Sequence, residues 1–357
     1  MLIEWGSFNP RAITKEFILL RWVNNVPKPI QTITDFNLTQ STDIFRFEPN
    51  NKICYSFTSR DLCGIYGDTS ALACLQGLDN PAPNLLIYTA TVVDDKEIKL
   101  VWEQAETDSF WRYQIWKKEG RFSNKFKLIE ELKNVSDTVY SDKDVLVDDA
   151  SYCYKIVNVD LCGNESVLNK EACSILLTGT AEPFINKAYW LPYDYWEQGI
   201  NRYELLKTEP LIYIDELFTS KTEKPLMAVD NQLNYDNGLY QYKVVAYENI
   251  FGNKQTSTSN TIDLVQLPLL YAPNAYTENG DGLNDSYQTV PVFVKDYHIQ
   301  IYNRWGERIF ESRDKKEGFN GEFKSVESKL DVYFYIINYA GWDGEAKTKK
   351  GNFTLLR

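Results

Sequence analysis

The sequence predicts an all-β protein made of tandem antiparallel β-sandwiches. Short runs of β-branched and aromatic residues, separated by turn residues about every 8–12 positions, are typical of sandwich strands. The phrases CYSFTSRDLCGIYGDTSALAC and CYKIVNVDLCGNESVLNKEAC begin at Cys54 and Cys153 and space three cysteines identically. Self-similarity over about one hundred residues indicates repeated structural modules. The 24 tyrosines and 18 phenylalanines also favour strands.

The repeat predicts three similar modules followed by a different C-terminal domain. We expect the modules at 1–80, 81–179 and 180–267, and the C-terminal domain at 268–357. The third module lacks the cysteines, but the segment GLYQYKVVAYENIFGN (238–253) has the same alternation of residues as ASYCYKIVNVDLCGN (150–164). The segments GLDNPAPN (77–84) and TGTAEP (178–183) are interpreted as short Pro/Gly linkers between modules.

Each module is expected to contain short, alternating strands. In the first two modules these are LIEW (2–5), EFILLRWV (16–23), DIFRFEP (43–49), EIKLVWEQ (97–104), RYQIWKKEG (112–120), KFKLIEEL (125–132) and DTVYSDKD (137–144). A second-strand tryptophan and a Tyr-x-Tyr-x-Val-x-Ala penultimate strand resemble fibronectin type III domains. Trp5 and Trp102 match that tryptophan, and KAYWLPY (187–193) matches it more loosely. The first module starts at its second strand, so we expect Met1 to begin a fragment of a longer exported protein.

Four of the six cysteines are expected to form two structural disulfides. A hairpin turn near Gly64 would bring Cys74 opposite Cys54, and antiparallel partners lie within disulfide range. We therefore predict Cys54–Cys74 and Cys153–Cys173, each closing a loop worth about 3 kcal/mol. Cys63 and Cys162 stay unassigned, and pairing with Cys74 and Cys173 instead remains open. A metal site is less favoured, because no Cys-x-x-Cys pair accompanies them.

Composition argues against several classes of function. A net charge of −12 disfavours nucleic-acid binding, and the single histidine, His298, leaves little for acid–base or transition-metal chemistry. No apolar run approaches the roughly 20 residues that span a bilayer, and no signal peptide is evident. Paired disulfides nevertheless predict an oxidising compartment. We expect no catalysis, although an accessory region of a secreted hydrolase is kept as an alternative.

The last ninety residues depart from the repeat and predict one more small sandwich. Alternating strands surround Tyr302, Phe310, Tyr335 and Leu355, with a hairpin turn at Gly306. The sequence motifs of these ninety residues resemble the gliding-motility-associated C-terminal domain, a type B signal of type IX secretion substrates in Bacteroidota. The matching residues are Pro273, Asn274, Ala275, Asn279, Gly280, Asp281, Gly282, Leu283, Asn284, Asp285, Asn303, Arg304, Trp305, Gly306, Tyr333, Tyr335 and Arg357. GFNGEF (318–323) and KLDVYF (329–334) depart from the family at two turns.

The resemblance implies a location at the cell surface and a set of partners. Such domains direct attached modules to the cell surface through the type IX translocon of the outer membrane. Fibronectin-like modules before one are similar to SprB- or RemZ-type surface proteins, which implies a gliding-motility adhesin. The implied partners are the shuttle PorV, the translocon Sov or a PorP/SprF-like barrel. A component that stays with the translocon is an alternative.

Three features each leave two interpretations open. Asn279, Asp281, Asn284 and Asp285 offer oxygen ligands for calcium, or they form an Asx/Gly turn network bonded to its own backbone. YWLPYDYWEQ (189–198) either stacks on sugars or fills a core and an edge, and packing is favoured. Trp305 beside Arg304 is either an interface anchor or a domain-packing residue. Apart from possible calcium, no cofactor is expected.

Overall fold

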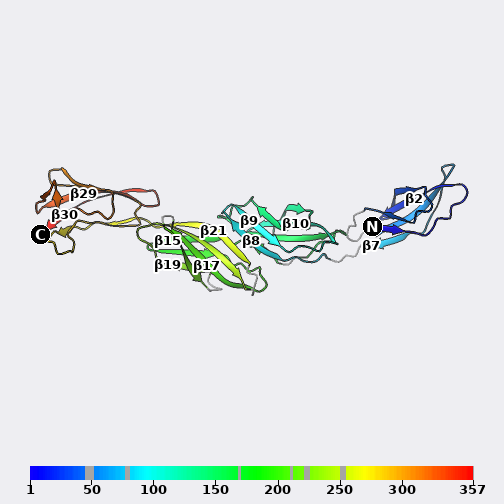
Figure 1. The fold of residues 1–357 in the computed structure, drawn as a ribbon, viewed down its shortest axis with the longest axis horizontal. Helices are drawn as coiled ribbons and strands as arrows, with labels where there is room; N and C mark the ends of the chain where they lie inside the picture. The colour runs from blue at the N-terminus through cyan, green and yellow to red at the C-terminus, as the bar shows by residue number, and fades with distance from the viewer. Residues whose placement is uncertain are drawn as a thin grey trace. The chain divides into compact units, whose positions relative to one another are not determined.

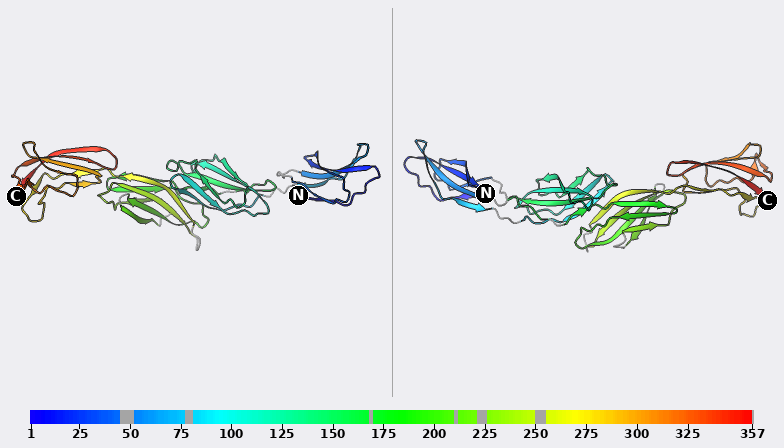
Figure 2. Two further views of the ribbon diagram at one scale, coloured as in Figure 1. Left: turned by 45° about the horizontal axis from the view of Figure 1, so that its top comes forward. Right: turned by 180° about the vertical axis from the view of Figure 1, so that it is seen from behind.

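The chain folds into β-strands joined by turns and loops. The computed structural model describes residues 1–44, 52–76, 81–167, 170–209, 212–220, 226–249 and 255–356, and these ranges contain no helix (Figure 1). The strands fall into four groups along the sequence, β1–β7, β8–β14, β15–β21 and β22–β30, which are recognisable in each view (Figures 1 and 2). By compactness, residues 89–99, 141–152 and 173–357 form one unit and the remaining residues form another.

The second and third strand groups share one sheet plan. Each pairs a three-stranded sheet, β12-β9-β8 or β15-β16-β19, with a four-stranded sheet, β11-β10-β13-β14 or β18-β17-β20-β21. This arrangement is that of a fibronectin-type sandwich, and the predicted all-β fold class is confirmed. The strands are β8 (Ile87–Val93), β9 (Glu97–Trp102), β10 (Phe110–Glu119), β11 (Lys127–Leu132), β12 (Val139–Asp142), β13 (Tyr152–Asp160), β14 (Ala172–Cys173), β15 (Leu177–Glu182), β16 (Ile185–Trp190), β17 (Ile200–Glu209), β18 (Ile212–Ser220), β19 (Met227–Asp230), β20 (Leu239–Glu248) and β21 (Thr256–Val265).

The first strand group follows the same plan with a two-stranded sheet, β1-β4, in place of the three-stranded one. Its other sheet runs β3-β2-β5-β6, and β7 also pairs with β5. Most of the predicted run 43–49 lies outside the described residues, and the strand before it is β4. The strands are β1 (Leu2–Glu4), β2 (Thr14–Val23), β3 (Val26–Ile33), β4 (Gln40–Thr42), β5 (Lys52–Asp61), β6 (Tyr66–Thr69) and β7 (Ala73–Gln76).

Aromatic side chains fill the cores between the sheets. Trp102 is buried and meets the Tyr113 ring edge-on at 5.6 Å, and Trp190 meets Tyr203 at 5.7 Å. In the first strand group, Trp5 contacts Phe57 at 5.0 Å. The segment 189–198 therefore packs inward, because Tyr193, Tyr195 and Trp196 are buried together with Trp190. This favours the packing interpretation over a sugar-stacking face.

Both predicted disulfides are present. Cys54 and Cys74 lie directly opposite each other on β5 and β7 and are bonded. Cys153 and Cys173 are the other two bonded cysteines, so they pair with each other. The thiols of Cys63 and Cys162 are free, which excludes the alternative pairing through the hairpin tips. Burial and the Asp160 carboxylate raise the pKa of the Cys162 thiol, so this thiol resists ionisation.

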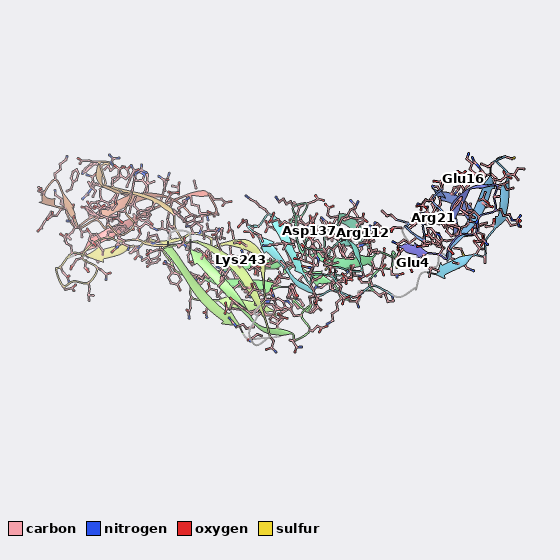
Figure 3. The ribbon with its side chains drawn as sticks, turned by 45° about the vertical axis from the view of Figure 1, so that its right-hand side comes forward. Glu4, Glu16, Arg21, Arg112, Asp137 and Lys243 are labelled. Atoms are coloured by element: carbon pink, nitrogen blue, oxygen red, sulfur yellow. A yellow bond between two sulfur atoms is a disulfide. The ribbon has the colours of Figure 1, made fainter. Side chains whose placement is uncertain are left out.

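A buried cation–carboxylate–tyrosine triad occurs in the first and third groups. Arg21 on β2 contacts Asp43 at 2.9 Å, and the Tyr55 hydroxyl donates to the same carboxylate at 2.8 Å. Figure 3 labels Arg21. In the third group, Lys207 contacts Asp230 at 2.9 Å and Tyr242 donates to it at 2.6 Å. The second group carries Lys117, Asp142 and Tyr154 on the corresponding strands. The triads were not predicted.

One predicted linker is wrong. Residues 178–183 belong almost entirely to β15, which pairs with β16 from Leu177↔Trp190 to Glu182↔Ile185. Gly179 is there because space is short: a Cβ atom on it would lie 2.7 Å from the Ile262 side chain and 2.9 Å from the Lys187 carbonyl oxygen. A glycine that permits close approach was interpreted as a loop glycine. Of the other predicted linker, residues 81–84 contain no strand, and 77–80 lie outside the described residues.

The C-terminal strand group is built on a five-stranded sheet, β23-β30-β29-β25-β26. Its core stacks Tyr287 on Phe353 at 3.7 Å and packs Tyr333 against the same ring at 5.7 Å. The strands are β22 (Leu269–Tyr271), β23 (Ala275–Thr277), β24 (Val290–Val292), β25 (Asp296–Tyr302), β26 (Arg308–Ser312), β27 (Glu322–Phe323), β28 (Val326–Glu327), β29 (Val332–Ala340) and β30 (Ala346–Leu356). Its own core makes this group the fourth sandwich-like element that the sequence predicts.

Candidate functional site

The predicted sorting motifs converge at one end of the five-stranded sheet. β23 runs parallel to β30, and β29 runs antiparallel to both β30 and β25. The ends of β23, β25 and β30 and the start of β29 therefore lie together. We call this the motif end: loop 278–285, turn 303–306, residues 330–334 and Leu356. Segments almost eighty residues apart in sequence meet there because of the strand directions alone.

The loop 279–285 is a turn network closed by one carboxylate. Asp285 accepts backbone N–H groups from Gly280 and Gly282, both at 2.8 Å, and a longer one from Asn279. Asp281 accepts the Leu283 N–H at 2.8 Å. These bonds hold the pKa of Asp285 below its usual value, with the Gly282 N–H as the largest cause. The geometry is the Asx/Gly network that the sequence analysis set against calcium.

Glycine is required at two positions in this loop. Gly280 and Gly282 have φ values of 74° and 84°, and Asn284 has 56°. Glycine and asparagine are the residues that adopt this left-handed region most readily. In the part of the chain that the structure describes, the one cluster of three or more His, Cys, Asp or Glu side chains close enough to hold a metal is Cys153, Glu171 and Cys173, whose two sulfurs are already joined. Calcium at the loop stays an untested prediction.

The turn network predicts how the loop responds to pH and to chelators. Because the folded pKa of Asp285 is depressed, its contribution to stability is complete above the ordinary value of 3.8 and is lost as pH falls through the lower folded pKa. We expect the amides of Gly280 and Gly282 to lose hydrogen-exchange protection only below about pH 4. At neutral pH, excess EDTA should not shift the melting temperature. A fall in melting temperature with EDTA, restored by calcium, would contradict the turn-network interpretation.

The turn 303–306 presents an exposed tryptophan. The Asn303 side-chain oxygen accepts the Trp305 and Glu307 N–H groups, both at 3.0 Å, and Gly306 has φ 80°. Arg304 forms an ion pair with Asp331, which fixes the turn to the start of β29. Trp305 is 84% exposed. The part of the chain that the structure describes therefore does not bury Trp305, and its role as an interface anchor stays a prediction.

Two other predicted motif residues, Tyr333 and Tyr335, lie in the core instead of at the surface. Tyr333 is buried and its hydroxyl donates to the Lys329 carbonyl oxygen at 2.7 Å. Tyr335 is buried above Gly351, and burial raises its pKa. Asn274 contributes its backbone oxygen, which accepts the Thr354 N–H at 2.9 Å. Arg357 lies outside the described residues.

An apolar patch at the motif end was missed by the sequence analysis. Val332 and Phe334 are 39% and 46% exposed, because Tyr333 and Tyr335 take the inward face of β29. The patch consists of Trp305, Leu330, Val332, Phe334 and Leu356, all exposed, and we call it the docking patch after the role proposed for it below. The available signal was the run VYFYII, in which both faces of the strand are apolar. The first part of β29 accordingly buries one face in its own core and leaves the other face exposed.

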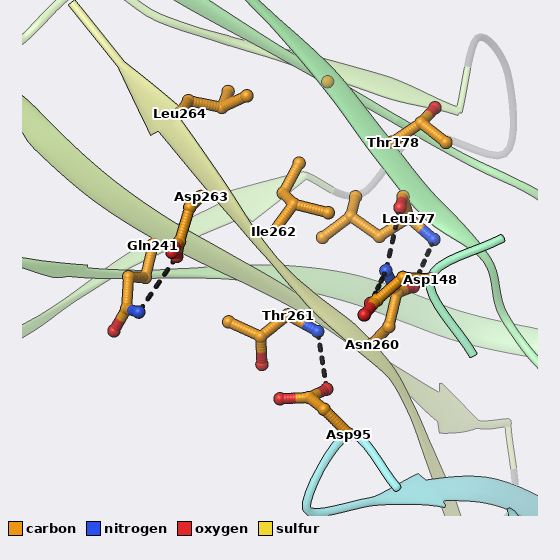
Figure 4. A pocket seen from close by; sticks show the side chains of 11 residues that line it. Asp95, Asp148, Leu177, Thr178, Gln241, Asn260, Thr261, Ile262, Asp263 and Leu264 are labelled. Atoms are coloured by element: carbon orange, nitrogen blue, oxygen red, sulfur yellow. Dashed lines mark hydrogen bonds between the residues drawn. The ribbon is translucent and has the colours of Figure 1, made fainter. Parts of the chain in front are cut away.

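The unit containing residues 173–357 also has a pocket, and its polar residues bond neighbouring segments of the chain. The pocket has a volume of about 550 Å³ and is lined by residues of β15 and β21 and by Asp95 and Asp148 (Figure 4). Asp95 accepts the Thr261 N–H at 2.7 Å, and Asp148 accepts the Asn260 side chain at 3.1 Å. Asn260, fully buried, also bonds the Leu177 backbone at both N and O. The polar groups that line this pocket therefore hold neighbouring segments together.

Comparison with known proteins identifies the C-terminal strand group. Residues 270–355 match the family model described as CHU_C Type IX secretion signal domain. The chain ends in a type IX secretion signal domain. This domain includes all strands from β23 to β29 and nearly all of β30, and its match implies export to the cell surface. Among the described residues, no helix is long and apolar enough to span a membrane.

Two solved structures are similar to this chain at low identity and with TM-scores below 0.5. One is the crystal structure of chicken CNTN1 FN1-FN3 domains, at 13% identity, covering 78% of this chain and 99% of that chain, with a TM-score of 0.20. Another is the tetra-tandem repeat in the extending region of a large adhesion protein, at 12% identity, covering 96% and 92%, with a TM-score of 0.26. The search of curated proteins finds no significant match.

Proposed function

We propose that this chain is a non-catalytic cell-surface protein whose motif end docks on outer-membrane components of the type IX secretion system. The observation that carries this proposal is the match of residues 270–355 to the secretion signal domain. A signal of this kind works by being bound, so it needs a surface that remains open after folding. The docking patch is such a surface.

The composition of the docking patch suits a protein partner. Trp305 is the kind of residue that dominates binding energy at interfaces, and the Arg304 guanidinium lies 5.8 Å from its ring centroid. The Arg304–Asp331 pair forms a charged rim beside the apolar residues. An apolar centre with a polar rim is the usual anatomy of a protein interface. We propose PorV, Sov or a PorP/SprF-like barrel as the bound component.

The preceding strand groups support a role in display and adhesion. Many of their aromatic residues lie in cores, and the first and second groups each contain a disulfide, as extracellular modules often do. The sole histidine, His298, lies outside these groups, on the outer face of β25 in the signal domain, where it contacts Glu311 at 2.7 Å. We propose that these groups are the stalk of a gliding-motility adhesin and that no reaction is catalysed within them.

Removal of the signal domain tests the proposal. In the producing bacterium, deleting residues 268–357 should abolish surface exposure of the protein, measured by protease shaving of intact cells with quantitative immunoblotting. The protein should then accumulate inside the cell envelope. Unchanged surface exposure of the truncated protein would refute export through this domain.

A further inference from the structure

Two phenylalanines adopt backbone conformations that bulky residues avoid, and their side chains meet. Phe184 has φ 64° and Phe293 has φ 58°. Phe184 occupies the second position of a two-residue turn after Pro183, where glycine or asparagine is normal. A positive φ in a bulky residue is strained and persists where the surrounding structure requires it. The two rings lie 5.5 Å apart, although one belongs to the third strand group and the other to the signal domain.

Tyr235 completes the contact. Its ring lies 5.6 Å from both phenylalanines, and its carbonyl oxygen accepts the Phe293 N–H at 2.7 Å. We call Phe184, Tyr235 and Phe293 the aromatic latch. Phe293 is only 1% exposed, so its side chain is buried by this contact with the third strand group as well as by the signal domain. All three residues lie within the compact unit that includes 173–357.

The backbone around the aromatic latch is closely packed. A Cβ atom on Gly238 would lie 3.0 Å from the Trp342 ring and 3.1 Å from the Phe293 carbonyl oxygen. In the segment that joins the two groups, Gln266 is buried and its side-chain amide donates to the Glu182 carbonyl oxygen at 2.9 Å and to Asn186 at 2.8 Å. This connection is anchored, unlike a flexible linker.

The latch and the docking patch lie at opposite ends of the same sheet. Phe293 precedes the start of β25 at Asp296, and β25 ends at Tyr302, next to turn 303–306. Six residue steps along a strand span about 20 Å. The third strand group therefore contacts the signal domain at the end that does not carry the motifs.

We infer that the third strand group is a fixed carrier for the signal domain and that the aromatic latch holds the motif end pointing away from this carrier. The inference rests on the proposed function for its purpose, because a rigidly presented docking patch loses less orientational freedom on binding. On this inference, the region that presents the secretion signal extends beyond residues 270–355 and includes Phe184, Tyr235 and Gly238 of the carrier.

The test is a double-mutant cycle on the full chain, read by hydrogen exchange. Phe293→Ala, Tyr235→Ala and the double variant are compared with Phe122→Ala, a control at a 92% exposed ring in the second strand group. We expect Tyr235→Ala to speed exchange at 292–296, and Phe293→Ala at 234–239, at least about tenfold each. The double variant should exceed the larger single effect only slightly, because the residues act through one contact.

Each result bears on the latch independently of export. If each substitution affects only its own strand group, or if the two effects multiply fully, the latch does not join the groups and the inference fails. Tyr235→Ala leaves the signal-domain core intact, so it remains decisive even if Phe293→Ala unfolds that domain, which exchange in β29 would reveal. A failed export experiment on the 268–357 deletion would refute the proposed function and leave this result unaffected.

Discussion

Asp230→Ala is expected to destabilise the third strand group by about 3–5 kcal/mol. The substitution leaves the Lys207 ammonium, 6% exposed, without the carboxylate that it contacts at 2.9 Å. It also removes the acceptor for the Tyr242 hydroxyl. Burial and the Asp230 hydrogen bond raise the pKa of Tyr242 well above its ordinary value, so Tyr242 remains a donor at every physiological pH. Chemical denaturation followed by tryptophan fluorescence measures the loss.

A matched control separates burial from charge pairing. Glu182 and Lys187 form a contact of 2.6 Å in the same strand group, but both side chains are partly exposed. Glu182→Ala should cost less than about 1 kcal/mol, as exposed ion pairs do. If Asp230→Ala costs no more than Glu182→Ala, the triad is not the buried electrostatic link described here.

Simultaneous substitution of Trp305 and Phe334 by alanine is expected to reduce surface display at least about tenfold without unfolding the signal domain. Truncating an interface anchor commonly costs 2 kcal/mol or more, and 1.4 kcal/mol corresponds to tenfold in binding. Both side chains face outward, so the core around Phe353 should be unaffected. Protease shaving of intact cells gives the display level, and thermal melting of the purified protein reports on the fold.

Phe122→Ala is the matched control, since it removes an exposed ring from a strand group outside the signal domain. It should leave display unchanged. Normal display of the Trp305/Phe334 double variant would show that the docking patch is not the surface that the export machinery binds, even if the domain itself remains necessary.

Local patterns predicted much of the architecture. The spacing of Cys54 and Cys74 identified opposite positions on two antiparallel strands, because a hairpin with a fixed turn sets its own register. The turn at Gly306 was equally predictable from the sequence, because Asn and Gly at fixed offsets favour its geometry. The C-terminal motifs located the candidate site within the chain. For the disulfide and the turn, the information lies within about twenty residues.

Features that depend on distant contacts were not predictable. Arg21 and Lys207 alternate with apolar residues and resemble ordinary outward-facing charges until a segment distant in sequence brings in Asp43 or Asp230. Nothing local indicates that Phe184 and Phe293 adopt left-handed backbone conformations, because that strain is supported by contacts across two strand groups. Gly179 was misinterpreted for the same reason, since its neighbour is Ile262.

Site-specific photocrosslinking in living cells tests the central claim most directly. A benzoylphenylalanine in place of Trp305, in the otherwise unchanged full-length protein, should crosslink to an outer-membrane protein of the type IX system, identified by mass spectrometry. The same group in place of Phe122 should not. Absence of any such crosslink at position 305, with the protein still displayed on the surface, would contradict docking through the motif end.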